Sequence, residues 1–202
     1  MITLSNNSDS IIVVLHEIYG INQHIKQVCE YYNQAGFDII CPDLLNLSKS
    51  FDYHYEEDAY KYFMKNVGFS LASQQVKNLI SQLNYKYKHI FILGYSIGAT
   101  IAWLCSDMEI RCDGVIGYYG SRIRDYLYII PKCKTLLIFA HKEESFRVNS
   151  LLCTLKKKAN VNAYMLSGVH GFSDPFSPNY CDKSYREAEK LVNDFLKENN
   201  QY

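Results

Sequence analysis

The chain has 202 residues, of which 48% are hydrophobic, and this is enough apolar material for one compact domain with a full core. Lysine plus arginine and aspartate plus glutamate both number 21, so the formal net charge is zero. That balance offers no electrostatic footprint for nucleic acid or an anionic membrane, and we expect neither as a partner. We expect a single domain over residues 1–202.

The chain shows no sign of secretion or membrane insertion. Residues 1–10 lack the basic and apolar segments of a signal peptide, and no apolar run is long enough to span a bilayer. Seven cysteines are scattered without a CxxC pair or a Cys/His spacing typical of zinc sites. We therefore expect reduced thiols, a cytoplasmic location and no metal.

Apolar runs of strand length alternate with segments of helical periodicity, which is typical of an α/β fold with a mostly parallel sheet and helices on both faces. The expected strands cover residues 11–15, 37–41, 89–93, 114–118, 135–140 and 162–166. Apolar residues at steps of three and four predict helices over 25–35, 76–83, 99–105 and 183–197.

One segment, residues 46–70, interrupts this alternation. It is too long for a plain turn, and it carries seven aromatic side chains together with several acidic ones. Aromatic side chains in such a segment usually pack helices onto the edge of a sheet. The alternative is a cap insertion that shapes a substrate pocket, and the sequence leaves both interpretations open.

Residues 94–98 read Gly-Tyr-Ser-Ile-Gly and lie between an expected strand and an expected helix. This is the context of a nucleophile elbow, in which a tight turn projects a serine hydroxyl from the carboxyl edge of the sheet. Glycines on either side allow the strand and the helix to approach closely. The pattern predicts Ser96 as a nucleophile, and a Gly-Ser turn with only a structural role is the alternative.

A serine hydroxyl needs a base to take its proton, and the base needs a carboxylate to orient it. His170 follows the last expected strand in a glycine-rich loop, which fits the chain order serine, acid, histidine. The acid is expected in the loop after residues 135–140, where Glu143 and Glu144 are both available. We favour Glu143 and leave Glu144 open.

Acyl transfer also needs two main-chain N–H groups to stabilise the oxyanion of the tetrahedral intermediate. One comes from the residue after the nucleophile and the other from a loop that follows an early strand. These requirements select Ile97 and Ile18. The preceding pair, His16 and Glu17, stands at the same strand end.

Five stretches together resemble the dienelactone hydrolase family of the α/β-hydrolase fold. They are VVLHEIYGIN at 13–22, AGFDIICPDLL at 35–45, GYSIGAT at 94–100, GVIGYYG at 114–120 and GVHGF at 168–172. The resemblance implies that Ser96 takes the place of the nucleophile, His170 that of the base and Glu143 that of the acid. It further implies that Glu17 is the family's active-site glutamate, and that Ile18 and Ile97 supply the oxyanion hole.

The sequence departs from the family pattern in three places. Ser96 stands where the best-known members have cysteine, and Glu143 where they have aspartate. Members that cleave dienelactones bind the substrate carboxylate with arginines, one of them shortly after the histidine. Residues 171–174 of this chain are instead Gly-Phe-Ser-Asp, which argues against a dienelactone substrate.

These observations predict a serine hydrolase that cleaves a small carboxylic ester or lactone through an acyl-enzyme, without a cofactor. A peptidase or an acyltransferase with the same triad is an alternative, because the fold and the triad do not set the acceptor. A non-catalytic member that binds a small ligand is a further alternative. The sequence leaves the physiological substrate and the oligomeric state open.

Overall fold

The computed structural model describes residues 1–47 and 49–200, so residue 48 of the aromatic segment and the last two residues of the expected domain lie outside the described residues. The chain forms a seven-stranded sheet with the strand order β1-β3-β2-β4-β5-β6-β7. β1 pairs with β3 in antiparallel orientation, and every other neighbouring pair is parallel. The expected α/β architecture is confirmed.

Six of the seven strands match expected ones, although several extend further than the apolar runs. The strands are β1 (Ile2–Leu4), β2 (Ser10–Leu15), β3 (Asp38–Cys41), β4 (His89–Tyr95), β5 (Gly114–Tyr118), β6 (Lys134–Lys142) and β7 (Val161–Val169). β1 was not expected from the sequence, because three residues next to a polar loop give no strand pattern. It covers one edge of β3.

The helices include all four that were expected, and α2 and α5 in addition. They are α1 (Gln23–Gln34), α2 (Glu56–Asn66), α3 (Gly68–Leu83), α4 (Ile97–Cys105), α5 (Val148–Leu155) and α6 (Asp182–Asn199), with short 3₁₀ helices η1 (Tyr53–Tyr55) and η2 (Ser121–Tyr126). The expected start of α4 at Ala99 was wrong by two residues, since the helix begins directly after Ser96.

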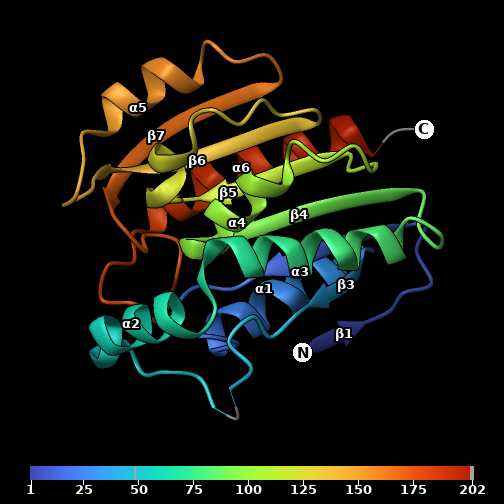
Figure 1. Ribbon diagram of the computed structural model, residues 1–202, viewed down its shortest axis with the longest axis horizontal. Helices are drawn as coiled ribbons and strands as arrows, with labels where there is room; N and C mark the ends of the chain where they lie inside the picture. The colour runs from blue at the N-terminus through green and yellow to red at the C-terminus, as the bar shows by residue number, and fades with distance from the viewer. Residues whose placement is uncertain (48, 201–202) are drawn as a thin grey trace.

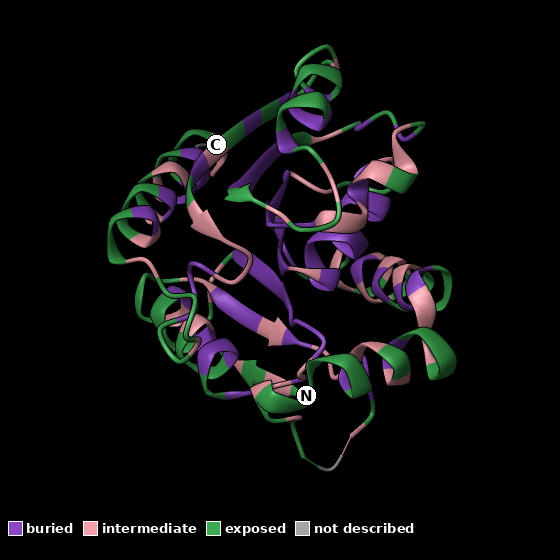
Figure 2. Ribbon diagram, turned by 90° about the vertical axis from the view of Figure 1, so that its left-hand side faces the viewer, coloured by how far each residue is buried: buried purple, intermediate pink, exposed green. Residues whose placement is uncertain are grey.

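The sheet buries both of its faces, as a parallel sheet normally does. In β2, Ile11, Val13 and Leu15 belong to the core that α2, α3, α4 and α5 cover. The residues between them, Ile12 and Val14, belong to the core that α1 and α6 cover. Figure 2 shows the result, with buried strands between helices whose outer surfaces are exposed.

The aromatic segment consists of η1, α2 and the beginning of α3, at the lower left of Figure 1. Phe63 and Phe69 are buried in the core with their rings 5.0 Å apart, so these two aromatics pack as the first interpretation predicts. Tyr53 and Tyr60 line the main cavity. The segment therefore contributes to both the core and the cavity wall, and a cap that shapes a substrate pocket stays a prediction.

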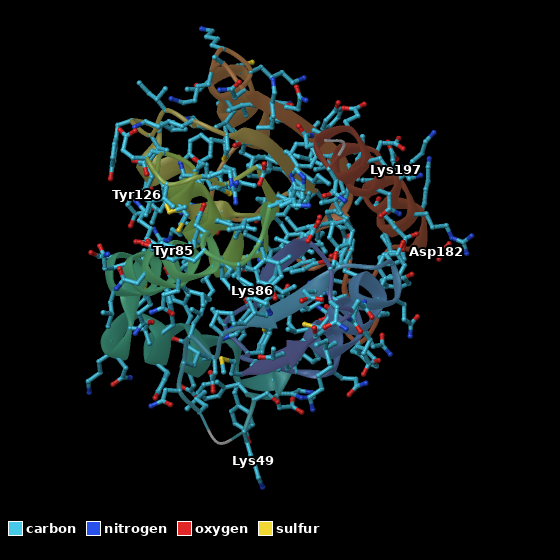
Figure 3. The ribbon with its side chains drawn as sticks, turned by 90° about the vertical axis from the view of Figure 1, so that its right-hand side faces the viewer. Lys49, Tyr85, Lys86, Tyr126, Asp182 and Lys197 are labelled. Carbon is cyan, nitrogen blue, oxygen red and sulfur yellow. The ribbon has the colours of Figure 1, made fainter. Side chains whose placement is uncertain are left out.

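Many charged side chains lie at the surface of the molecule, although Glu17, Asp38 and Asp174 are buried. Figure 3 shows Lys49 pointing away from the loop before η1, and Asp182 and Lys197 pointing outward from α6. Among the described residues, no helix is long and apolar enough to cross a membrane.

The strands β2, β4, β5, β6 and β7 run in one direction, so their carboxyl ends share one edge of the sheet, on the left of Figure 1. The loops after β2, β4, β6 and β7 carry the candidate residues Glu17, Ser96, Glu143 and His170. The loop after β7 contacts η1 at this edge, where the hydroxyl of Tyr53 donates a hydrogen bond to Asp174. Ligands of open α/β sheets bind at the carboxyl ends of the strands, and the candidate site is located there.

Candidate active site

Ser96 occupies the sharp turn between β4 and α4. Its φ of +52° and ψ of −112° lie outside the regions that L residues normally adopt, so the backbone is strained at this residue. A Cβ on Gly94 would lie 2.3 Å from the carbonyl oxygen of Gly98, and a Cβ on Gly98 would lie 2.3 Å from that of Leu15. The turn therefore requires glycine at both flanking positions.

The structure brings together Ser96, His170 and Glu143 from three different loops. The Oγ of Ser96 lies 2.9 Å from Nε2 of His170, which is hydrogen-bond distance. On the other side of the ring, Nδ1 of His170 lies 3.1 Å from each carboxylate oxygen of Glu143. This is the arrangement of a nucleophile, a base and an orienting acid.

The two candidate acids have different environments. The side chain of Glu143 is only 5% exposed, and it faces the imidazole of His170. Glu144 is exposed, and no hydrogen bond from its side chain to His170 is present. The geometry therefore favours Glu143 over Glu144.

His170 has an altered proton affinity. Burial disfavours the imidazolium, but the hydrogen bond and the negative charge of Glu143, together with the charge of Glu17, outweigh burial and raise the pKa of His170 above its ordinary value. A raised pKa strengthens His170 as a proton acceptor once the ring is neutral.

Ile97 and Ile18, the residues expected to form the oxyanion hole, both line the cavity. Ile97 is the first residue of α4, and the first amides of a helix have no partner within the helix. Ile18 follows β2 on the adjacent loop, and both residues line the same cavity as Ser96 and His170.

The cavity has a volume of about 650 Å³ and opens at the carboxyl edge of the sheet. Arg122 and Arg124 line it, but other protein groups already engage both side chains. Arg122 donates hydrogen bonds to the hydroxyl of Tyr60 at 2.9 and 2.7 Å and pairs with Asp125 at 3.1 Å. Arg124 donates to the carbonyl of Ser121.

Glu17 is buried below this cavity with 4% of its surface exposed. One of its carboxylate oxygens accepts a hydrogen bond of 3.0 Å from the hydroxyl of Tyr119, which also lies 2.8 Å from Oγ of Ser173. Burial, and then the nearby charge of Asp174, raise the pKa of Glu17 to about 7. Glu17 therefore accepts a proton far more readily than a surface glutamate.

The sequence reasoning missed three buried side chains beside Glu17. They are Tyr119, His24 and Asp174. Nδ1 of His24 lies 3.7 Å from a carboxylate oxygen of Asp174, and one donor atom from each of Glu17, His24 and Asp174 lies within 4.8 Å of the others. Glu17, His24 and Asp174 carry the carboxylate and imidazole groups that commonly bind metal ions. The available signal was the position of Asp174 four residues after His170, in the loop that follows β7.

The chain was compared with known proteins. The model of the "Dienelactone hydrolase family" matches residues 2–200. Among curated relatives, the chain is 38% identical over 169 residues to "Uncharacterized protein YczH" of Bacillus subtilis, covering 83% of this chain and 82% of the relative. It is 22% identical over 191 residues to "Carboxymethylenebutenolidase 1" of Cupriavidus pinatubonensis, covering 87% and 80%.

A solved structure also resembles this chain in fold. The dienelactone hydrolase-like promiscuous phosphotriesterase from metagenomic libraries superposes with a TM-score of 0.75 at 13% identity. The match covers 96% of this chain and 88% of the other. At this identity the similarity concerns the fold alone, which is the α/β-hydrolase fold.

Proposed function

Because this chain belongs to the dienelactone hydrolase family and is a hydrolase, we propose that it cleaves a small carboxylic ester or lactone through an acyl-enzyme formed on Ser96. The observation that carries the proposal is the distance of 2.9 Å between Oγ of Ser96 and Nε2 of His170. At this distance the imidazole accepts the hydroxyl proton as the oxygen attacks.

The reaction follows from this geometry in two halves. Oγ of Ser96 bonds to the acyl carbon while its proton moves to Nε2 of His170, and the amides of Ile18 and Ile97 stabilise the oxyanion. The bond to the leaving alkoxide then breaks, and His170 returns the proton to it. Water, deprotonated by His170, next attacks the acyl-enzyme and releases the acid and free Ser96.

Glu143 acts on the reaction indirectly, by orienting His170 and stabilising its charged form. Its two oxygens hold the Nδ1–H tautomer, which leaves the lone pair of Nε2 directed at Ser96. Its charge also stabilises the imidazolium that exists after each proton transfer. Because its side chain is only 5% exposed, water screens this interaction little.

The cavity supports a small, uncharged or weakly charged substrate. A volume of about 650 Å³ lies within the usual range for small-molecule sites. Tyr60, Asp125 and a main-chain carbonyl take up some of the donors of the two arginines of the cavity wall. Carboxylates of the protein also line the cavity, among them Glu56, Glu143 and Glu144, so an ester or lactone without a second carboxylate fits these walls best.

The proposal extends to the setting in which the enzyme works. All seven cysteines are free thiols, which supports a reducing compartment, and we place the enzyme in the cytoplasm. One continuous sheet with a core on each face supports a single domain.

The test uses a fluorophosphonate probe and an activated short-chain ester. The wild type should be labelled on Ser96 and should hydrolyse the ester, and Ser96→Ala should do neither. Ser145→Ala is the matched control, since Ser145 lines the same cavity outside the proposed triad, and it should retain labelling and turnover. An inert wild type, or labelling that survives in Ser96→Ala, contradicts the proposal and favours a non-catalytic ligand-binding role.

A further inference from the structure

Beneath the cavity lies a group of buried polar side chains that the proposed hydrolysis does not use. Glu17 comes from the loop after β2, His24 from the first turn of α1 and Asp174 from the loop after β7. Their exposed fractions are 4%, 2% and 1%. The fold thus brings two carboxylates and an imidazole together in the interior, where water reaches them little.

The negative charge of this group lacks a cationic partner. Within residues 1–47 and 49–200, no lysine or arginine forms an ion pair with Glu17 or Asp174. Removing a carboxylate from water costs several kcal/mol unless another charge or a proton compensates.

The imidazole provides an independent observation. Nδ1 of His24 is fully buried and has no hydrogen-bond partner, which is rare for a buried polar atom. It faces Asp174 at 3.7 Å from Oδ2. The ring is held by an edge contact with Tyr95, the two ring centres being 4.8 Å apart. A buried imidazole nitrogen without a hydrogen-bond partner, fixed beside two carboxylates, is an atom of the type that binds metal ions.

We propose that Glu17, His24 and Asp174 bind one divalent transition-metal ion of the Zn²⁺ type. Imidazole and carboxylate donors suit Zn²⁺ and its first-row neighbours, and three protein ligands with one open position are typical of zinc sites that also bind water or substrate. Two carboxylates and one divalent cation are together neutral.

The distances agree with this assignment. Tetrahedral ligands at about 2.1 Å from zinc lie about 3.4 Å apart. His24 and Asp174 are already close to this separation, at 3.7 Å, and all three donor atoms lie within 4.8 Å of one another. Shortening these separations to those of bound ligands requires side-chain movements on the order of 1 Å.

The surroundings also resemble those of a metal site. Ligating carboxylates usually accept further hydrogen bonds that fix their orientation. Tyr119 donates such a bond to Glu17, and Tyr53 donates one to Asp174. Glu17 and Asp174 line the cavity, so an ion can enter from there and its open position faces the same space.

Such an ion joins the loop that carries Ile18 to the loop that carries His170. We therefore assign it a positioning role for the oxyanion hole and the base. The proposal goes beyond the ester hydrolysis above, which uses Ser96 and His170 and needs no metal. Metal binding can be measured without a substrate, so the two proposals are tested separately.

The experiment starts from full-length protein stripped with a chelator and titrates it with Zn²⁺. One ion per chain should bind, and Zn²⁺ at about 100 times its Kd should raise Tm by roughly 5–10 °C. Co²⁺ in its place should give visible absorption bands without the intense near-ultraviolet band of thiolate ligation, which separates this site from the seven cysteines.

His24→Ala should weaken Zn²⁺ binding by about 100-fold or more and abolish the Tm shift. His141→Ala is the matched control, because it removes an exposed histidine that is not part of the group and should bind Zn²⁺ as the wild type does. Asp174→Asn, of nearly the same shape, tests the site again if His24→Ala does not fold. Failure of the wild type to bind, a thiolate band with Co²⁺, or unchanged binding by both variants overturns the proposal.

Discussion

At the scale of single residues, Glu143 and Glu144 are neighbours in sequence with opposite environments. Glu143 is buried against His170, and Glu144 is exposed. Glu143→Gln should lower kcat for an activated ester by about 10³–10⁴, because an amide neither holds the productive tautomer nor stabilises the imidazolium. Glu144→Gln keeps the same backbone and size and should change kcat less than about twofold. Equal loss in the two variants, or loss only in Glu144→Gln, shows that the acid is misassigned.

The proton affinity of His170 predicts the pH dependence of hydrolysis. The base must be neutral to accept the proton of Ser96, so kcat/KM falls as the pH drops through the pKa of His170. Glu143 and Glu17 raise this pKa, and the acid midpoint should therefore lie above the ordinary histidine value of about 6.5.

The same shift can be removed by substitution. In Glu143→Gln only the smaller contributions of Glu17 and Glu56 still oppose the effect of burial on the ring, so the midpoint of the residual activity should move to lower pH. The measurement is kcat/KM for an ester between pH 5 and 9. A midpoint that does not move between wild type and Glu143→Gln contradicts the pairing of the two residues.

The sequence predicted the catalytic candidates better than their surroundings. Ser96 and His170 could be selected because each follows a strand, and parallel strands bring their carboxyl ends to one edge. The choice between Glu143 and Glu144 required coordinates, since neighbouring side chains in a loop can point in opposite directions. His24 and Asp174 meet only through tertiary packing, and no local spacing connects them with Glu17.

At the scale of elements, the junction of β2, β4 and α4 determines the site. A Cβ on Gly98 would lie 2.3 Å from the carbonyl oxygen of Leu15 and 2.7 Å from that of His16, and both are main-chain atoms that side-chain rotation cannot move. Alanine at this position must push α4 away from the end of β2. The same movement separates the amides of Ile97 and Ile18.

Gly98→Ala should therefore lower both stability and kcat. We expect a loss of about 3 kcal/mol, the upper part of the range for overpacking, and a fall in Tm of roughly 10 °C. Gly117→Ala is the matched control, because its Cβ would meet mainly side-chain atoms of Leu137 and Ala99 at 3.0 and 3.2 Å. Thermal unfolding and ester kinetics of the two variants measure the difference. A Gly98→Ala variant as active and stable as Gly117→Ala refutes this reasoning.

The elements that the sequence did not predict are short or lack a clean pattern. β1 has only three residues, and its pairing depends on β3 being in place. α2 buries only Ala59 and Phe63, so tyrosines and charges obscure its periodicity. α5 does have the helical spacing, with Val148, Leu151, Leu152 and Leu155 buried. It went unrecognised because it is brief and lies between two strands.

At the scale of the whole molecule, the carboxyl-end edge and the amino-end edge of the parallel sheet have different roles. The carboxyl edge carries the candidate site and strained backbone, as at Ser96. The amino edge carries a hydrogen-bond network around Asp38, the first residue of β3. Its carboxylate accepts bonds from the amides of Asn6 and Ser8 at 2.6 and 3.2 Å and from the hydroxyl of Tyr87 at 2.8 Å. Asp38 thus joins the loop before β2 to the segment before β4.

Asp38→Ala should destabilise the protein without affecting catalysis. It leaves several donors without their acceptor, and we expect a loss of about 2–4 kcal/mol in the free energy of unfolding with kcat unchanged within about twofold. Asp9→Ala is the control at the same edge, since it removes only an exposed pair with Lys88 and should cost less than about 1 kcal/mol. Urea denaturation and ester kinetics give both quantities.

The pH dependence of this loss has a definite sign. Burial alone would raise the pKa of Asp38, but the hydrogen bonds from Asn6, Tyr87, Ser8 and Ser5 outweigh it and hold the pKa below its ordinary value. A lowered folded-state pKa gives stability that is complete above the unfolded value of about 3.9 and is lost as the pH falls through the folded value. The stability difference between wild type and Asp38→Ala should therefore be constant from pH 5 to 7 and shrink below about pH 4. A difference that grows on acidification, or a fall in kcat at neutral pH, contradicts a purely stabilising role for this edge of the sheet.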